Sequence, residues 1–578
     1  MTSHLLFRMW SLIFAATLLS FCYMARGSHL WEKQRRAEPT ALIKLHIGLK
    51  CGNVYQNLER LALEIATPSA PQYRRHLTRD ELRRALELPE NQVQHIYQWL
   101  DTVEFLQRIQ RGQFIEALMT VKEAKRLLDT SYHIYTDGAR EIIRTETYHT
   151  PNHLQGLVAL ITPTTHFPGR AKSKRSNLEI PFEPRGLQER WSTCGSSNDT
   201  TPSCIWKIYN ISYTAKPNRT TFAVYATEAA SYILQKYNPP AAAANARFQV
   251  IGSGDPAEGM PGIEGAFKTH LDTQTSLGLA WPAKGVLHNL GGVFGPNPSQ
   301  TYVHFVQFLQ DLIHNETVPS VVSFSESMPE DQVDPAYEQQ LCSMMAQVGT
   351  RGVTLLFSFG DNGPQGDQPS GKHEAIFEPE FPASCPFVTS VGGTTNMLAE
   401  EGATKTTITG LINKISYTAT GGGFSNLFSR PSYRNHTVSQ YIANHVPESY
   451  YSDLGFNSSG RGIPDVSAFE SVTVPIGGTS ASTPLWAAVI TLLNDYEVSQ
   501  GRAPLGFVNP WLYSIQNGAL KDITPGGNNA GACHLLTGCT IPKTPGYNIT
   551  TGWDPATGLG SPVFPALLTA LDETAGRS

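Results

Sequence analysis

Alternating hydrophobic and polar positions predict short elements of both kinds near the start of the chain. Residues 41–50 (ALIKLHIGLK) alternate with a period of two, which predicts a strand, and residues 54–65 carry apolar side chains at helical spacing. In residues 77–89 (LTRDELRRALELP), Thr78 and Glu81 have the spacing of a capping box that starts a helix. Strands and helices in such close succession predict a compact α/β domain.

A different pattern follows in the second part of the chain. The continuous apolar runs 321–325 (VVSFS) and 352–361 (GVTLLFSFGD) are typical of strands buried on both faces. Apolar residues at helical spacing precede each of these runs, at 302–313 and 337–348. Strands that alternate with helices predict a parallel sheet with crossover helices, and functional residues gather at the carboxyl ends of such strands. Asp361 stands at one such end.

The stretch 476–486 (IGGTSASTPLW) passes abruptly from small polar residues into an apolar helical pattern. Thr479, Ser480 and Ser482 are all candidate N-caps, and Pro484 is acceptable in a first helical turn. The alternative is that Ser480 is a nucleophile held at the start of the helix. A serine at a helix start suits both interpretations, so the local pattern leaves them open.

The length of the chain and its first residues predict the number of domains and secretion. A chain of 578 residues is too long for one core and predicts two or three domains. Residues 9–25 (MWSLIFAATLLSFCYMA) are apolar and uncharged after Arg8, which predicts a secretory signal peptide over residues 1–27, with a signal anchor as the alternative. Sequons for N-glycosylation begin only after residue 190, at Asn198, Asn210, Asn218, Asn315, Asn435, Asn457 and Asn548.

The cysteines favour the same secreted, extracellular location. The chain has eight, of which Cys22 lies in the apolar start and Cys51 stands alone. The other six form neighbouring pairs, at Cys194 and Cys204, Cys342 and Cys385, and Cys533 and Cys539. Three such pairs are consistent with three disulfides formed in an oxidising compartment.

Charge divides the chain into two parts of opposite sign. Residues 28–190 hold 24 Lys and Arg against 19 Asp and Glu, a net charge of +5, whereas residues 191–578 hold 18 against 30, a net charge of −12. The two parts attract each other at neutral pH, and acidification weakens that attraction as carboxylates take up protons. Between them, residues 169–190 begin with the basic stretch GRAKSKR and predict an exposed, cleavable linker. A secreted proenzyme fits this pattern better than a nucleic-acid-binding protein, since residues 191–578 are acidic.

A carboxylate-assisted serine system fits the remaining polar residues better than a histidine system. The H-G-T-H setting that accompanies the G-T-S serine of subtilisin-type enzymes is absent. Asp272 lies in an amphipathic helical pattern, and a protonated Asp361 would be able to donate a hydrogen bond to an oxyanion. The alternatives are a surface charge paired with Lys268 for Asp272, and an Asx-type turn residue for Asp361.

Ordered motifs then connect the chain to a known family. They are ATPSAPQYRRHLTRDEL (66–82), TPSCIWKIYN (201–210), LDTQ (271–274), QVGTRGVTLLFSFGD (347–361), FPASCPFVTSVGGTT (381–395), GGGFSNLFSRPSY (421–433), GRGIPDVSAF (460–469), GGTSASTP (477–484), DIT (522–524) and GWDPATGLGSP (552–562). This set resembles the sedolisin family of serine-carboxyl peptidases, in its tripeptidyl-peptidase branch, and the first motif resembles the pro-kumamolisin activation domain. The resemblance implies an α/β, subtilisin-like peptidase domain over residues 191–578 and a smaller α/β activation prodomain over residues 28–168.

The resemblance also implies an activity and its residues. Ser480 matches the nucleophile, Asp361 the aspartate of the oxyanion hole, and Asp272 the aspartate that supports the general base. The expected function is hydrolysis of peptide bonds by a secreted enzyme at acidic pH, with release of N-terminal tripeptides as one expected form. The expected partners are a peptide or protein substrate and the chain's own prodomain, as chaperone and inhibitor. We expect a monomer, with no nucleic-acid partner and no membrane contact after signal removal.

The C-terminal motifs resemble the calcium-binding tail of the family. Asp522 and Asp554 match the carboxylate ligands, and backbone oxygens are expected from Ile523, Thr550 and Gly552. Two acidic residues do not make a zinc site, whereas oxygen ligands suit Ca²⁺. Ca²⁺ is therefore the expected bound ion.

The chain departs from the family pattern at the general base. The family has a glutamate four residues before the helix aspartate, where this chain has Lys268, and Glu264 lies one further turn upstream. Three mechanisms stay open: Glu264 or Asp272 acts as the base, a neutral Lys268 acts as the base nearer neutral pH, or the protein is an impaired peptidase that binds peptides or partners.

Four further departures lie near the predicted chemistry. The S-G-D-S-G segment of the family reads Phe359-Gly-Asp-Asn-Gly here, and Glu326 and Ser327 replace an aromatic residue and a glycine. An acidic residue at Glu326 would change which substrate side chains are accepted.

Overall fold

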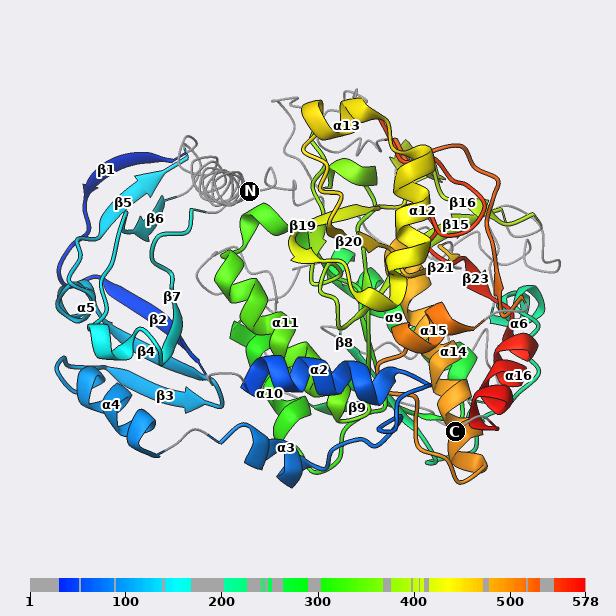
Figure 1. The fold of residues 1–578 in the computed structure, drawn as a ribbon, viewed down its shortest axis with the longest axis horizontal. Coiled ribbons are helices and arrows are strands. Elements are labelled where there is room, and N and C mark those ends of the chain that lie inside the picture. The colour runs from blue at the N-terminus through cyan, green and yellow to red at the C-terminus, as the bar shows by residue number, and fades with distance from the viewer. Residues whose placement is uncertain are drawn as a thin grey trace, which may run out of the picture. The chain divides into compact units, whose positions relative to one another are not determined.

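A computed structural model of the chain contains two compact units (Figure 1). It describes residues 31–50, 54–87, 90–137, 141–167, 202–225, 241, 243–244, 248–251, 263–288, 303–366, 376–396, 399–404, 406–409, 415–470, 478–515, 518–530 and 545–576. The smaller unit comprises Met1–Gly52, Glu87–Ala171 and Asp331–Glu338, and the larger unit comprises Asn53–Leu86, Lys172–Glu330 and Gln339–Ser578. The predicted signal peptide and linker lie outside the described residues. Among the helices that are described, none is both long and apolar enough to cross a membrane.

The smaller unit is built on two antiparallel sheets, in the orders β3-β4-β2-β7 and β1-β5-β6. Its elements are β1 (Glu32–Arg36), β2 (Leu42–Leu49), α4 (Glu90–Leu100), β3 (Gln107–Arg111), β4 (Phe114–Thr120), α5 (Val121–Leu128), β5 (His133–Thr136), β6 (Glu141–Arg144) and β7 (Val158–Thr162). The strand predicted from the alternation at 41–50 is β2, whose inward side chains Leu45 and Ile47 are fully buried. The described parts of residues 31–50 and 90–167 therefore form a small α/β unit, whereas the helices predicted at 54–65 and 77–89 belong to the larger unit, which corrects the prediction of one compact domain.

The larger unit contains an eight-stranded sheet among its described residues, in the order β16-β15-β13-β11-β8-β10-β9 with β21 beside β15. Its strands are β8 (Thr221–Tyr225), β9 (Gln249–Ile251), β10 (Lys284–His288), β11 (Val321–Phe324), β13 (Thr354–Ser358), β15 (Thr389–Thr395), β16 (Glu401–Gly402) and β21 (Val466–Phe469). Every pairing is parallel except that of β15 with β16. The two buried strands predicted from apolar runs are β11 and β13, and the parallel α/β fold is confirmed.

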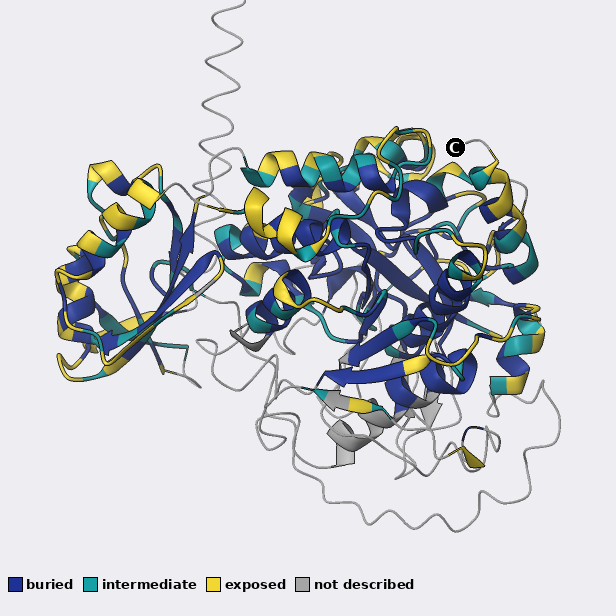
Figure 2. Cartoon of the chain, turned by 90° about the horizontal axis from the view of Figure 1, so that it is seen from below, coloured by how far each residue is buried: buried dark blue, intermediate teal, exposed yellow. Residues whose placement is uncertain are grey.

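Helices cover this sheet and bury it (Figures 1 and 2). The α-helices of this part of the chain are α2 (Val54–Ala66), α3 (Arg79–Ala85), α6 (Pro202–Ile208), α9 (Ile263–Ala280), α10 (Val303–His314), α11 (Pro335–Thr350), α12 (Asn435–His445), α13 (Glu448–Asp453), α14 (Thr479–Ser499), α15 (Asn509–Ser514) and α16 (Phe564–Ala575). The helices α10 and α11 are those predicted at 302–313 and 337–348. The helix α14 is buried along almost its whole length and contacts β11, β13 and β15 as well as α9. Its N-terminus is therefore placed at the edge where these parallel strands end.

Shorter pairings complete the larger unit. They join β12 (Met328–Pro329) with β14 (Glu380–Phe381), β17 (Thr406–Thr409) with β18 (Ile415–Thr418), β19 (Gly423–Ser429) with β20 (Gly460–Ile463), and β22 (Leu520–Lys521) with β23 (Ser561–Pro562). The β12–β14 pair holds the segment that follows β11 against the segment that leads to Cys385.

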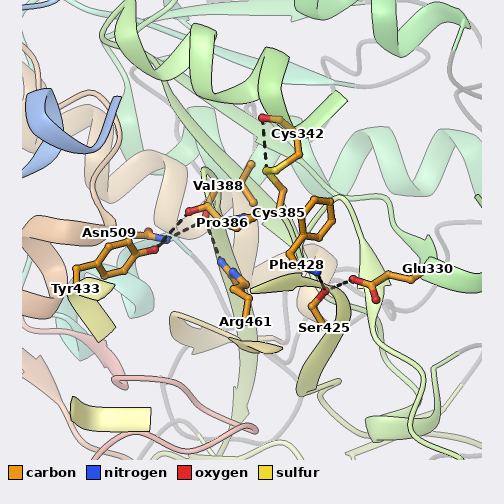
Figure 3. Close-up of a disulfide and its surroundings, with 10 residues drawn as sticks. All are labelled: Glu330, Cys342, Cys385, Pro386, Val388, Ser425, Phe428, Tyr433, Arg461 and Asn509. Carbon is orange, nitrogen blue, oxygen red and sulfur yellow. Dashed lines mark hydrogen bonds between the residues drawn. A yellow bond between two sulfur atoms is a disulfide. The ribbon is translucent and has the colours of Figure 1, made fainter. Parts of the chain in front are cut away.

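A disulfide fastens α11 to that second segment (Figure 3). It joins Cys342 to Cys385, which confirms one predicted pair. Beside it, the main-chain oxygen of Val388 accepts hydrogen bonds from Arg461 at 3.0 Å and from Asn509 at 2.9 Å. Cys204 is also disulfide-bonded. The other cysteines of the predicted pairs lie outside the described residues.

Candidate active site

Ser480 lies in the first turn of α14 and is half-buried. The N-cap is Gly478, with a φ of 107°, so the prediction that Thr479, Ser480 or Ser482 caps the helix is wrong. A Cβ atom at Gly478 would lie 2.4 Å from Oδ2 of Asp361, and only glycine allows this approach. The close contact with Asp361, rather than local capping, determines the start of the helix.

Asp361 lies next to Ser480 because β13 and α14 meet at this edge of the sheet. Its Oδ1 accepts hydrogen bonds from the main-chain N–H of Thr479 at 2.7 Å and from the Thr479 hydroxyl at 3.0 Å. Its main-chain oxygen accepts from the N–H of Ala419 at 3.0 Å. These contacts hold the Asp361 carboxyl group beside the residue that precedes Ser480.

Asp272 approaches Ser480 from α9, through Ser325. It is 1% exposed, and its Oδ1 accepts a hydrogen bond from the Ser325 hydroxyl at 2.7 Å. The same hydroxyl lies 3.2 Å from the main-chain oxygen of Ser480, and the Ser480 hydroxyl donates to the main-chain oxygen of Ser325 at 3.4 Å. The alternative that Asp272 is a surface charge is wrong, because α9 packs this face against α14.

Lys268 and Glu264 lie on the same helix, but their side chains are outside the described residues. Their main-chain positions in α9 are one and two turns before Asp272. The structure thus brings together Ser480, Asp361 and Asp272, and it places Lys268 and Glu264 on the helix that carries Asp272.

Two residues near the site were missed in the sequence interpretation. Ser325 directly follows β11, so its position at the carboxyl end of a parallel strand was a usable signal. Glu380 is 3% exposed, and a Cβ atom at Gly360 would lie 2.6 Å from both of its carboxylate oxygens. It accepts a hydrogen bond from the Ser327 hydroxyl. No local pattern indicates Glu380, because the β12–β14 pairing joins two distant segments and Glu380 lies next to Gly360 as a result.

The other departures from the family pattern lie on the same edge. Phe359 is 3% exposed and enters the core before Asp361, whereas Glu326 is half-buried after β11. Glu326 and Glu380 make this part of the site acidic.

The predicted calcium residues lie close together in the C-terminal part. Asp522 Oδ2 accepts from the N–H of Gly552 at 2.7 Å, and Asp554 Oδ2 accepts from the N–H of Thr550 at 3.2 Å. Burial raises the pKa of Asp554 to about 7, and burial also raises the pKa of Asp522.

The donor atoms at this place are suited to a cation. Asp554 is fully buried, and no described cationic side chain pairs with it. Within the described residues, no hydrogen bond reaches the main-chain oxygens of Ile523, Thr550 or Gly552, and the buried hydroxyl of Thr550 has no partner. These are oxygen donors of the kind that Ca²⁺ prefers, so the residues fit the expected ion.

Comparison with known proteins extends over nearly the whole chain. Residues 29–167 match the family model described as the pro-kumamolisin activation domain. Tripeptidyl-peptidase SED2 of Arthroderma otae is 31% identical over 582 residues, covering 94% of each chain. Tripeptidyl-peptidase sed4 of Aspergillus fumigatus is 31% identical over 612 residues, covering 98% of each. A solved structure of Pseudomonas sedolisin aligns with a TM-score of 0.49 and 22% identity, over 66% of this chain and 99% of that one.

The fold and these relatives define a serine-type peptidase that carries an activation prodomain. The chain belongs to the sedolisin family of serine-carboxyl peptidases, among its tripeptidyl-peptidase-like members.

Proposed function

We propose that the protein is a secreted peptidase that hydrolyses peptide bonds with Ser480 as its nucleophile. The observation that carries this proposal is the convergence of Ser480, Asp361 and Asp272 where β11, β13 and α14 meet. A serine nucleophile needs a base for its proton and donors for the oxyanion, and carboxyl groups flank Ser480 on both sides.

The proposed reaction has two steps. Ser480 Oγ attacks the carbonyl carbon of the substrate and passes its proton to the base, while the protonated Asp361 donates a hydrogen bond to the oxyanion. The leaving amine takes that proton from the base as the peptide bond breaks, and water then releases the acyl group from Ser480. Because Asp361 must carry a proton to donate, this role favours acidic working conditions.

The identity of the base is the open part of the proposal. Asp272 is a candidate base because its side chain lies close to Ser480 through Ser325. Glu264 and Lys268 are candidates from their main-chain positions on α9. A lysine is charged at acidic pH and has no lone pair to accept a proton. Lys268 therefore supports a second candidate function, an impaired peptidase that binds peptides or partners without cleaving them efficiently.

We also propose that cleavage releases tripeptides from free N-termini, as the names of the relatives indicate for those proteins. The experiment is mass spectrometry of products from one peptide with a free N-terminus and from its N-acetylated form. Tripeptides from the free form only are expected. Internal fragments from both forms would instead indicate an endopeptidase.

The activation domain is proposed to act as an intramolecular chaperone and inhibitor that is removed by cleavage within residues 169–190. Support for secretion comes from the apolar N-terminus. Exposed sequon asparagines are compatible with glycosylation, and these are Asn210, Asn218, Asn315, Asn435 and Asn548.

Ca²⁺ is proposed to bind between Asp522 and Asp554, with main-chain oxygens of Ile523, Thr550 and Gly552. Its role there is structural, since a bound cation neutralises the buried Asp554 carboxylate. Adding Ca²⁺ at about 100 times its Kd should raise the free energy of unfolding by about 2.7 kcal/mol, seen as a higher Tm. The shift should be absent in Asp554→Asn, and an equal shift in that variant would contradict the site.

A further inference from the structure

Residues 54–86 match the activation domain in sequence, yet they belong to the larger unit in structure. The chain leaves the smaller unit before α2 and returns to it after α3. Within the larger unit, α2 contacts α15 and α3 contacts α10. We call residues 54–86 the arm.

The arm is bound to the peptidase by hydrogen bonds along its length. Near its start, the amide of Gln340 donates to the Tyr55 hydroxyl at 3.1 Å. After α2, the main-chain N–H of Leu77 donates to the main-chain oxygen of Thr350 at 2.8 Å. The inner face of α2 is apolar and buried, with Leu58, Ala62 and Ile65 at most 3% exposed. The arm is thus packed as a part of the peptidase unit.

An ion cluster at the end of α14 receives one arginine of the arm. Glu497 is fully buried and accepts from Arg502 Nε at 3.0 Å and Nη2 at 2.5 Å, while Arg502 also pairs with Asp572 at 2.9 Å. These three peptidase residues carry a net charge of −1. Arg74 Nη1 donates to Glu497 Oε2 and neutralises that charge. Since Arg502 already holds Glu497, the peptidase side of this contact does not depend on Arg74.

The peptidase also has space for the ring of His76, two residues after Arg74. A Cβ atom at either Gly352 or Gly506 would lie 2.7 Å from the ring of His76. A ring nitrogen of His76 lies 2.8 Å from the main-chain oxygen of Pro504. Arg74 itself has a φ of 56°, a left-handed conformation that costs an arginine about 1 kcal/mol. The docked contacts therefore hold a turn that is unfavourable on its own.

These contacts lie far from the nucleophile. Ser480 and Glu497 are at opposite ends of α14, about 26 Å apart at 1.5 Å per residue. The arm therefore does not need to occlude the candidate active site to hold on to the peptidase.

We propose that the arm is an anchor separable from the rest of the activation domain, and that this face of the peptidase is a preformed receptor for a helical peptide bearing an arginine. The rest of the activation domain folds on its own core of β2, β4 and β7. After cleavage in the linker, the anchor keeps the activation domain bound as a non-covalent partner. The inference does not depend on whether Ser480 cleaves peptides.

The test is hydrogen exchange measured by mass spectrometry on the full chain at pH 7, in a Ser480→Ala background that prevents self-processing. Arg74→Ala should speed exchange in residues 54–86 by about tenfold or more, because a buried ion-pair contact is lost. Exchange in β2 and β4 should stay unchanged. Arg75→Ala is the matched control, since Arg75 is exposed and forms no ion pair among the described residues.

The reciprocal variant is Leu45→Ala, which opens a cavity in the sheet of the smaller unit. It should speed exchange in β2 and β4 and leave residues 54–86 protected. If Leu45→Ala does not yield folded protein, the milder Ile47→Val makes the same comparison. The proposal would be overturned if Leu45→Ala sped exchange in the arm together with β2 and β4. It would also be overturned if Arg74→Ala left exchange in the arm unchanged.

Discussion

The residues that β13 and α9 bring to Ser480 differ in how closely they match the motifs of the family. On the β13 side, Asp361 is held by Thr479 and closely packed against Gly478, and these three residues match their motifs although Phe359 and Asn362 depart from the pattern. On the α9 side, Asp272 matches its motif and is buried, but Lys268 stands where the resemblance leads us to expect the base.

In the proposed mechanism, the two halves of the catalytic site can change independently. Oxyanion stabilisation would depend on the ends of β13 and α14, which are tied into the buried core. Proton transfer would depend on one side chain on one face of α9, so a single substitution there would alter the base and leave the fold and Asp361 in place.

The largest effect is expected on the β13 side. Asp361→Ala removes the carboxyl proton and supplies no other donor, so kcat/KM should fall by about 10²–10³-fold, the usual cost of one oxyanion donor. Steady-state kinetics on the processed enzyme measure this, with the exposed Asp453→Ala as control. Unchanged kcat/KM in Asp361→Ala would remove Asp361 from the oxyanion hole.

The next effect probes the α9 side directly. Lys268→Glu restores a carboxylate at the base position, and activity near pH 4 should rise by on the order of 10²-fold relative to activity near pH 7. The comparison of pH profiles needs the exposed Lys284→Glu as its charge-matched control. A fall in activity at every pH would show instead that Lys268 is itself the base.

A smaller effect is expected from the hydroxyl that joins Asp272 to Ser480. Ser325→Ala removes one buried hydrogen bond, worth about 1–1.5 kcal/mol, so kcat should fall by about tenfold with little change in KM. Ser323→Ala is the control, because Ser323 is equally buried and its hydroxyl has no partner among the described residues. Equal losses in the two variants would mean that Ser325 only fills space.

Much of this arrangement was predictable from sequence, and for identifiable reasons. The strands before Ser325 and Asp361 are long apolar runs, and parallel strands bring their ends together. The N-cap was predicted wrongly because the contact between Gly478 and Asp361 is made across 117 residues of sequence. Glu380 and the docking of residues 54–86 on the peptidase were not predicted, since both depend on pairings between distant segments.

The central claim is that Ser480 is a working nucleophile between these two sides. The most direct measurement is hydrolysis of a peptide with a free N-terminus by the processed protein from about pH 3 to 8, compared with Ser480→Ala, a range that spans the carboxylate and histidine pKa values. Cleavage should fall by at least about 10³-fold in Ser480→Ala. Absence of Ser480-dependent cleavage at every pH in this range would contradict the claim and favour the impaired, peptide-binding alternative.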